Sequence, residues 1–268
     1  MRLDPIAVKE GVRLESLGTT ASTNAEARLR AQGGDNGPLW ITATAQTKGR
    51  GRHGRAWISP PGNLYASLLL RDPSRFEDAP QLAFVTALAL RDAVALEAKT
   101  LVSRLKFKWP NDLLLAERKC AGILIEGEAG EAGKRFIVVI GIGVNCVNHP
   151  PPAQAGSDFP ATDLQAHGAT ITPEVLFTRL SATMCLRLAQ WDGGRGFPGI
   201  LGDWLNHARG IGEPIAVRNG DIEMQGRFIG LDHVGRLVLE RPDGGLAKIA
   251  AGDVFPFTVR GRTVVRPG

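Results

Sequence analysis

The sequence predicts an α+β protein, in which a mixed β-sheet flanked by helices is followed by a small SH3-like barrel. Between residues 23 and 209, apolar strand-like runs mix with amphipathic helical segments without a regular βαβ rhythm, which favours a mixed sheet. From residue 213 onward, short β-rich runs follow one another with turn signals and no helix. We therefore expect two domains, residues 1–212 and 213–268.

Each expected element of the first domain has a local signal. Thr23-Asn24-Ala25-Glu26 is a capping-box pattern that begins a short helix, and Gly33-Gly34 ends it. Apolar spacing, together with Pro and Gly near the ends, predicts further helices at residues 80–99, 173–191 and 198–209. Apolar and β-branched runs predict strands at residues 39–45, 63–71, 105–109, 112–116, 121–126 and 136–144.

The expected second domain begins with a hairpin signal. Asn219-Gly220 separates the runs 215–218 and 222–224, and this dipeptide favours a two-residue turn between antiparallel strands. Further short runs follow at residues 226–231, 236–240 and 246–250. Such short strands without a helix predict a small barrel.

Composition bounds the class of protein. With 268 residues, of which 43% are hydrophobic, the chain can bury the core of one large and one small domain. A net charge of +5 allows an anionic partner, but no long basic stripe occurs outside residues 48–55. The three cysteines are widely spaced, which argues against a disulfide scaffold and a zinc site. Residues 1–20 lack a hydrophobic signal core, and the longest apolar run, 136–144, is too short to span a bilayer. We expect a cytoplasmic protein without a membrane partner.

The most informative segment is the Gly/Arg loop, residues 48–57, which reads Lys-Gly-Arg-Gly-Arg-His-Gly-Arg-Ala-Trp. Its backbone N–H groups and guanidinium side chains are suited to binding a phosphate. The spacing matches a bare dinucleotide fingerprint, but Pro60-Pro61-Gly62 stops the helix that this motif must open. A Walker loop needs Ser or Thr where Ala56 stands. A disordered segment that binds nucleic acid is an alternative, although flanking strand candidates favour a loop in a folded sheet.

A second informative motif is Lys108-Trp109-Pro110-Asn111-Asp112. It is either a β-edge turn made by Pro-Asn-Asp or part of a nucleotide site. In a nucleotide site, Lys108 would bind phosphate and Asp112 a magnesium ion or a proton, with Trp109 as a wall. Lys119 is either a solvated strand end or a second activating cation.

Three further segments carry polar or glycine residues at element ends. Ser22-Thr23-Asn24 has the composition of a helix cap, but its hydroxyls and amide also suit a small neutral polar group such as a ureido ring. Gln46 offers the same kind of donor and acceptor. Residues 141–145 end a buried strand with two glycines, which let a ligand approach the backbone.

In this order, these segments resemble the biotin–protein ligase family (biotin–[acetyl-CoA-carboxylase] ligase). The resemblance implies adenylation of biotin by MgATP to biotinyl-5′-AMP, followed by transfer of biotin to a specific lysine of a biotin carboxyl carrier domain. ATP and Mg²⁺ are the implied cofactors, and the carrier domain of acetyl-CoA carboxylase or a related carboxylase is the implied partner. The matching segments are Ser22-Thr23-Asn24, Gln46-Thr47, Gly49 to Trp57, Lys108 to Asp112, Lys119 to Glu126, Gly141 to Asn145 and Gly230-Leu231-Asp232.

The resemblance also implies roles for individual residues. Those expected to act in catalysis are Arg52, Lys108, Asp112 and Lys119, with Asp112 as the metal ligand. Those expected to bind biotin are Ser22, Thr23, Asn24, Gln46, Gly49, Arg50, Arg52, Lys119 and Gly122. Those expected to bind ATP or the adenylate are Arg50, Arg52, Arg55, Trp57, Asn111, Gly143 and Asn145.

Some features depart from the family pattern. Thr44-Ala45 stand where many relatives have an acidic residue, and His53 stands where Arg or Gln is common, so we expect His53 to be solvated. Bifunctional members carry a winged helix upstream, so we expect a ligase without repressor activity or specific DNA binding. The alternatives are a lipoate- or octanoate-transferring relative and a nucleic-acid-binding module. The sequence leaves a homodimer and the identity of the acceptor open.

Overall fold

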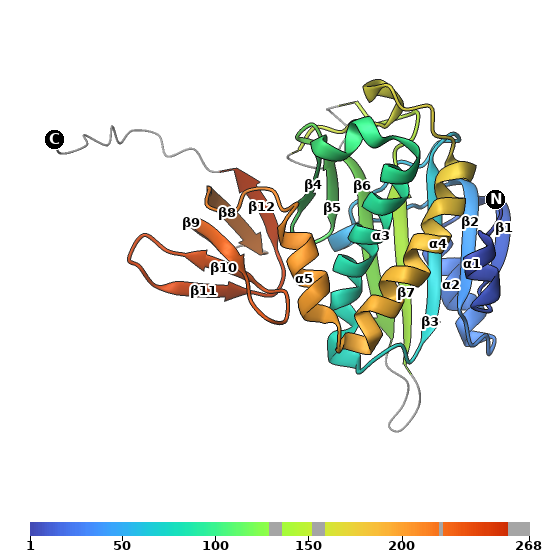
Figure 1. Ribbon diagram of the computed structural model, residues 1–268, viewed down its shortest axis with the longest axis horizontal. Coiled ribbons are helices and arrows are strands. Elements are labelled where there is room, and N and C mark those ends of the chain that lie inside the picture. The colour runs from blue at the N-terminus through green and yellow to red at the C-terminus, as the bar shows by residue number, and fades with distance from the viewer. Residues whose placement is uncertain (129–135, 152–158, 220–221, 257–268) are drawn as a thin grey trace.

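The computed structural model describes residues 1–128, 136–151, 159–219 and 222–256 (Figure 1). Its large sheet has seven strands in the order β1-β2-β3-β7-β6-β5-β4. The first two strands are parallel and all other neighbours are antiparallel, so the predicted mixed sheet is confirmed. The strands are β1 (Arg13–Thr20), β2 (Leu39–Gln46), β3 (Leu64–Arg71), β4 (Leu105–Lys108), β5 (Asp112–Leu115), β6 (Arg118–Glu128) and β7 (Ile137–Val144).

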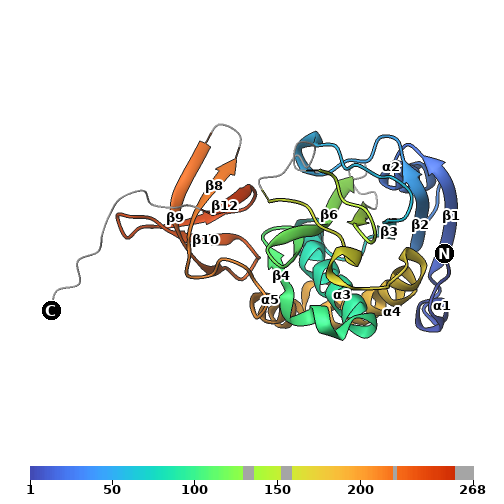
Figure 2. The same ribbon diagram turned by 90° about the horizontal axis from the view of Figure 1, so that it is seen from above.

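Helices cover the two faces of this sheet unequally, as Figure 2 shows. One face packs against α3 (Leu82–Glu97), α4 (Pro173–Trp191) and α5 (Phe197–Leu205) and forms the main core. On the other face, α2 (Thr23–Gln32) packs mainly on β2, β3 and β7, where a smaller apolar cluster forms. The short α1 (Pro5–Lys9) lies against α4. The part of the sheet that α2 leaves uncovered is therefore available for a ligand.

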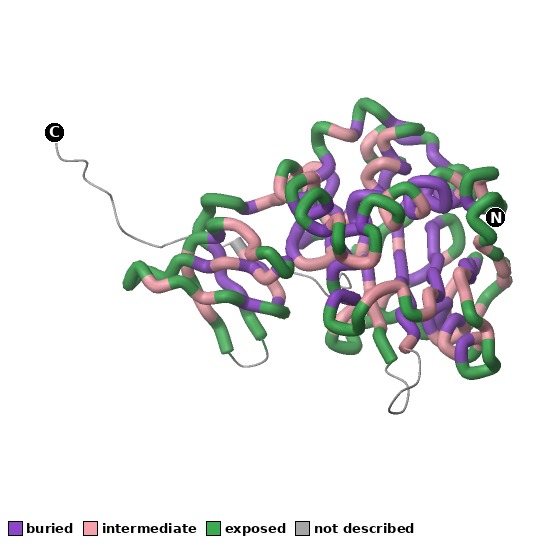
Figure 3. The backbone as a smooth tube through the Cα atoms, turned by 60° about the horizontal axis from the view of Figure 1, so that its bottom comes forward, coloured by how far each residue is buried: buried purple, intermediate pink, exposed green. Residues whose placement is uncertain are grey.

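The burial pattern agrees with this layering (Figure 3). Most of α3 is buried between the sheet and its neighbouring helices. The segment Phe76–Glu97 is long and apolar enough to cross a membrane by composition, but 72% of the apolar window is buried inside the fold. Packing in the core thus accounts for the apolar character of this helix.

Some local predictions were wrong. The N-cap of α2 is Ser22 rather than Thr23, and no side-chain capping bond forms. The Thr23 hydroxyl lies instead against Ser67 and Gln46, while Glu26 accepts from Thr20 and Arg30, so the capping-box groups have other partners. Strand β1 was not predicted because it is an edge strand without a clear apolar alternation. Helix α5 ends at Leu205, earlier than expected.

The C-terminal part forms a five-stranded antiparallel sheet in the order β11-β10-β9-β8-β12. This confirms the predicted fold class, although within the described residues β11 and β12 are separate edges and no closed barrel forms. Its strands are β8 (Pro214–Asn219), β9 (Ile222–Leu231), β10 (Leu237–Glu240), β11 (Leu246–Ile249) and β12 (Asp253–Pro256). β9 joins two runs expected as separate strands, and β12 was not predicted; Gly220 of the expected turn lies outside the described residues.

The two parts of the chain are in direct contact through residues next to their sheets. The indole N–H of Trp109 donates to the carbonyl of Gly235 at 3.0 Å, and Trp109 is buried. A Cβ at Gly235 would meet the ring of Phe84 at 2.8 Å, so a glycine is required for this close approach. The domain boundary at residue 212 stays a prediction.

Candidate active site

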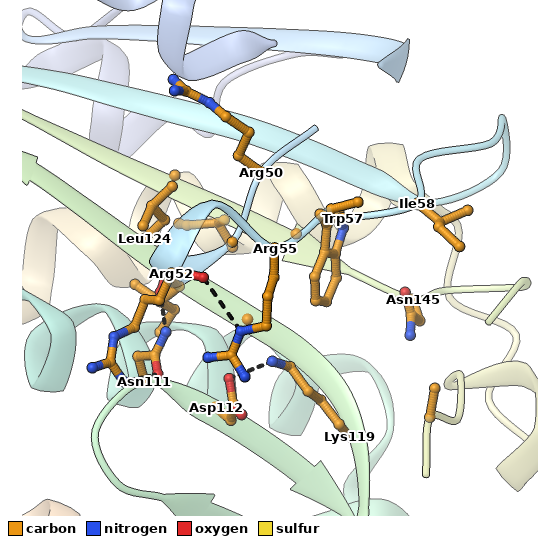
Figure 4. Close-up of a pocket in the computed structure, with 18 of the residues that line it drawn as sticks. Arg50, Arg52, Arg55, Trp57, Ile58, Asn111, Asp112, Lys119, Leu124 and Asn145 are labelled. Atoms are coloured by element: carbon orange, nitrogen blue, oxygen red, sulfur yellow. Dashed lines mark hydrogen bonds and ion pairs between the residues drawn. The ribbon is translucent and has the colours of Figure 1, made fainter. Parts of the chain in front are cut away.

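A cavity lies on the sheet face that α2 leaves uncovered, between the Gly/Arg loop, strands β5 to β7 and the start of β12 (Figure 4). Segments from both parts of the chain therefore form its wall. The predicted site residues that line it are Ser22, Thr23, Gln46, Arg50, Arg52, Arg55, Trp57, Lys108, Asn111, Asp112, Lys119, Gly122, Gly143 and Asn145. The predicted biotin contacts Asn24 and Gly49 are not part of the wall.

The floor of the cavity consists of two paired glycines under a tryptophan. Gly122 of β6 and Gly143 of β7 are register partners. A Cβ at Gly143 would lie 2.5 Å from Trp57 Nε1, and one at Gly122 would lie 3.1 Å from the same ring. A side chain at Gly143 would therefore displace the indole from the sheet, and one at Gly122 would crowd it. Its N–H is buried without a hydrogen-bond partner among the described residues, so a ligand atom that accepts a hydrogen bond there would be favoured.

A compact ionic cluster stands beside this floor. Lys119 Nζ lies 2.6 Å from Asp112 Oδ1, and Lys108 Nζ lies 3.7 Å from Asp112 Oδ2. Burial lowers the pKa of Lys108, and the opposing effect of Asp112 does not cancel it. Its ammonium group also lies 4.7 Å from the centre of the Phe159 ring. The cluster holds two cations around one carboxylate, so an anionic ligand would meet net positive charge.

Two arginines of the Gly/Arg loop face this cluster and contact the second sheet. Arg52 Nη1 lies 3.4 Å from Asn111 Oδ1 and donates to the carbonyl of Gly252 at 3.2 Å. Burial lowers the pKa of Arg52. Arg55 Nη2 donates to Asp253 Oδ1 at 2.8 Å. Asp253 therefore brings a carboxylate from β12 into the predicted phosphate site.

The other residues of this loop have different surroundings. Arg50 points away from Asp112 and Lys119 in Figure 4, and its Nη2 lies 3.6 Å from Glu126 Oε1. Gly49 is buried, and a Cβ there would come within 2.5 Å of the carbonyl oxygen of Trp57. His53 is exposed with a φ of 55°, which agrees with a solvated loop position.

Several wall residues were missed by the sequence reasoning. Asp253, Phe159 and Ala161 reach the cavity from segments far from the recognised motifs. Ala161 is in a β-bridge with Lys119, and the flanking Thr162 carbonyl accepts from Asn145 Nδ2 at 3.0 Å. No local pattern marks these residues, because only the fold brings them to the cavity.

The described residues contain no cluster of three or more His, Cys, Asp or Glu side chains that could hold a metal ion. Asp112, the predicted magnesium ligand, has a lysine next to each of its oxygens. These surroundings do not fit a divalent cation held by the protein, which needs several oxygen ligands.

Comparison with known proteins bears on this arrangement. The model of the Biotin/lipoate A/B protein ligase family matches residues 19–145, and that of the Biotin protein ligase C terminal domain matches residues 210–255. A biotin–[acetyl-CoA-carboxylase] ligase of Paracoccus denitrificans is 40% identical over 241 residues, which cover 89% of this chain and 98% of that relative. The chain belongs to the biotin protein ligase family. The predicted family and the predicted ligase class of enzyme are thus confirmed.

Other biotin protein ligases agree with this assignment. A bifunctional ligase/repressor of Bacillus subtilis is 35% identical over 222 residues, covering 80% of this chain and 65% of that relative. The biotin protein ligase of Aquifex aeolicus, solved in complex with biotin and ATP, superposes with a TM-score of 0.74 at 26% identity, covering 91% of this chain and 97% of that chain. The fold of a biotin protein ligase thus extends over both sheets.

Proposed function

We propose that the protein adenylates biotin with ATP and transfers it from biotinyl-5′-AMP to a specific lysine of a biotin carboxyl carrier domain. The observation that carries this proposal is the combination of groups in one cavity. The neutral polar side chains of Thr23 and Gln46 come from α2 and β2. The ionic cluster comes from strands β4 to β6, which lie toward the opposite edge of the sheet. Biotin has a neutral ureido ring and an anionic tail, and ATP brings further negative charge.

The cations have a definite task in this reaction. The carboxylate of biotin must approach the α-phosphate of ATP although both are anions. We propose that Lys119 and Arg52 stabilise the negative charge that develops between them, and that Lys108 and Arg55 bind the remaining phosphate oxygens. Asp112 lies between the two lysines and balances part of their charge. Because the described part of the chain has no cluster of side chains that would hold a metal ion, Mg²⁺ would arrive with ATP.

Trp57 and the glycine floor fit the adenylate. We propose that the indole forms one wall of the adenosine site, beside Gly143 and Asn145. A loop that closes over the mixed anhydride would also keep water from it.

The test is exchange of labelled pyrophosphate into ATP by the purified protein with magnesium. Exchange that depends on biotin, and is absent with lipoate or octanoate, is the expected result. Exchange with lipoate alone would assign the protein to the lipoate branch of the matched family. A folded sample that exchanges with none of the three acids would refute the adenylation proposal.

The second step has its own test. Incubation with ATP, biotin and an unmodified carrier domain should add one biotin to a single lysine, as measured by mass spectrometry. Replacement of that lysine by arginine should abolish the modification. Labelling spread over many lysines would contradict transfer within a specific complex. Cytoplasmic location and the absence of specific DNA binding stay predictions, and whether the protein forms a homodimer stays open.

A further inference from the structure

A row of hydrogen-bonded side chains runs behind the neutral part of the cavity, from Glu126 of β6 to Thr23 of α2. Asn24 Nδ2 donates to Glu126 Oε2 at 2.7 Å, and Ser67 Oγ lies 2.6 Å from Asn24 Oδ1 and 2.7 Å from Thr23 Oγ1. Ser67 is fully buried, and Asn24 is 4% exposed. Thr23 is the only member of this row that lines the cavity.

Glu126, the carboxylate at one end of the row, determines which atom donates in each hydrogen bond. Glu126 lies near two guanidinium groups and acts as an acceptor, so Asn24 must turn its NH₂ group toward it. Asn24 Oδ1 carries no proton, and the hydrogen bond between it and Ser67 therefore uses the Ser67 hydroxyl proton. Because that proton is used, the 2.7 Å contact between Ser67 and Thr23 must use the proton of Thr23.

Gln46 is oriented by the same kind of argument. The backbone N–H of Thr23 donates to Gln46 Oε1 at 2.8 Å, so the amide oxygen faces Thr23, while Nε2 donates to Ser59 Oγ at 3.0 Å. The Thr23 hydroxyl also lies 3.2 Å from Gln46 Oε1, but one proton cannot serve both neighbours and Ser67 is closer. Thr23 Oγ1 and Gln46 Oε1 each keep a lone pair for the cavity.

We propose that Glu126, Asn24 and Ser67 are positioning residues that hold Thr23 and Gln46 as a pair of hydrogen-bond acceptors. The pair selects a ligand that presents N–H groups. This inference rests on the proposed function, because the ureido ring of biotin has such groups and the dithiolane ring of lipoate has none. It also gives Asn24 a role behind the site in place of the direct contact expected from the sequence.

The test uses Ser67→Ala, which removes the acceptor of the Thr23 proton. That proton then turns to Gln46 Oε1, which already accepts from the Thr23 backbone N–H, so both lone pairs of this oxygen are used and one of the two acceptors is lost to the ligand. By calorimetry, the Kd for biotin should rise about tenfold, while the KM for ATP should change less than about twofold. Biotin methylated at either urea nitrogen should bind the wild type far more weakly than biotin. The ratio of the two Kd values should be smaller in Ser67→Ala. A purely structural defect would weaken both ligands alike and would leave this ratio unchanged.

Ser181→Ala is the matched control, because Ser181 is also fully buried and its hydroxyl donates to the Thr178 carbonyl at 2.7 Å, remote from the cavity. It should leave biotin binding and discrimination unchanged. If Ser67→Ala does not fold, Glu126→Gln is the second variant, since the Glu126 side chain is partly exposed. It replaces the carboxylate that fixes the orientation of Asn24, and it should likewise weaken the discrimination between biotin and methylated biotin. A wild type that binds no biotin would overturn both this inference and the proposed function. A wild type that binds biotin, with unchanged discrimination in the variants, would overturn the inference alone.

Discussion

At the scale of single residues, the site is defined by charges that compensate one another before any ligand binds. Asp112 is 8% exposed and lies between two lysines, so its charge is balanced inside the fold. Lys108 is equally buried, and burial lowers its pKa although Asp112 acts in the opposite direction. An incoming anion would relieve that cost, because it restores charge balance around the lysine.

Lys119→Ala should suppress both half-reactions by a factor of about 10² to 10³, because the variant lacks a cation at the point where two anions meet. Pyrophosphate exchange measures the first step, and transfer from preformed biotinyl-5′-AMP measures the second. Lys106→Ala is the control, since Lys106 lies on β4 but does not line the cavity. Near-normal rates in a folded Lys119 variant would remove it from the reaction.

Gly143→Ala should displace Trp57 from the floor, because the added Cβ would lie 2.5 Å from the indole. We expect biotin-dependent exchange to fall about tenfold or more. Unfolding free energy should fall by no more than about 1–3 kcal/mol, the usual cost of overpacking. Gly202→Ala in α5 is the control, since nothing lies within 4 Å of a Cβ there. Equal exchange rates in the two variants would argue against a role for the glycine floor.

At the scale of elements, the Gly/Arg loop is attached to β12 through Asp253. Burial tends to raise the pKa of Asp253, but the hydrogen bond from Arg55 and the charges of Arg55 and Arg52 hold it below the ordinary value of 3.8. A carboxyl group whose pKa is lower in the folded state stabilises the fold above its unfolded pKa. This contribution is lost as the pH falls through the folded value.

Asp253→Asn should therefore lower the unfolding free energy at neutral pH, by at most about 1 kcal/mol because both partners are partly exposed. The difference from the wild type should narrow as the pH falls below 3.8. Urea unfolding at neutral and acidic pH measures both quantities. A difference that stays constant down to acid pH would mean that the carboxylate charge is not what stabilises this contact.

The sequence predicted those elements whose signals are local. Strands β2, β3, β5 and β7 have apolar runs bounded by turns, and the motifs of the Gly/Arg loop and Lys108–Asp112 are contiguous. The contact between Arg55 and Asp253 spans 198 positions, so nothing near either residue could indicate it. Ser67 was overlooked for a similar reason, since an inward serine in an apolar strand acquires meaning only when α2 packs over it.

At the scale of the whole molecule, the second sheet is fixed to the first by buried contacts, of which the Trp109–Gly235 hydrogen bond is one. Trp109→Phe removes the donor and leaves a carbonyl unsatisfied, which should cost about 1–3 kcal/mol of unfolding free energy. Because Asp253 and Gly252 approach the arginines from this sheet, the KM for ATP should rise as well.

Trp191→Phe is the matched control. Trp191 is also buried and its indole N–H donates to Gln81 Oε1 at 2.8 Å, within the first domain. The control should lose comparable stability but leave the KM for ATP unchanged. If both variants change the KM equally, placement of the second sheet does not affect the nucleotide site.

The Arg55–Asp253 ion pair also bears on how products leave. An anion that binds Arg55 Nη2 would compete with a carboxylate that belongs to the protein itself, so this ion pair would weaken the binding of a phosphate group at that atom. The same carboxylate is still attached nearby when the anion departs and can re-form the pair at once. In the proposed reaction, Asp253 would thus lower the affinity of Arg55 for phosphate and would favour the release of pyrophosphate and AMP.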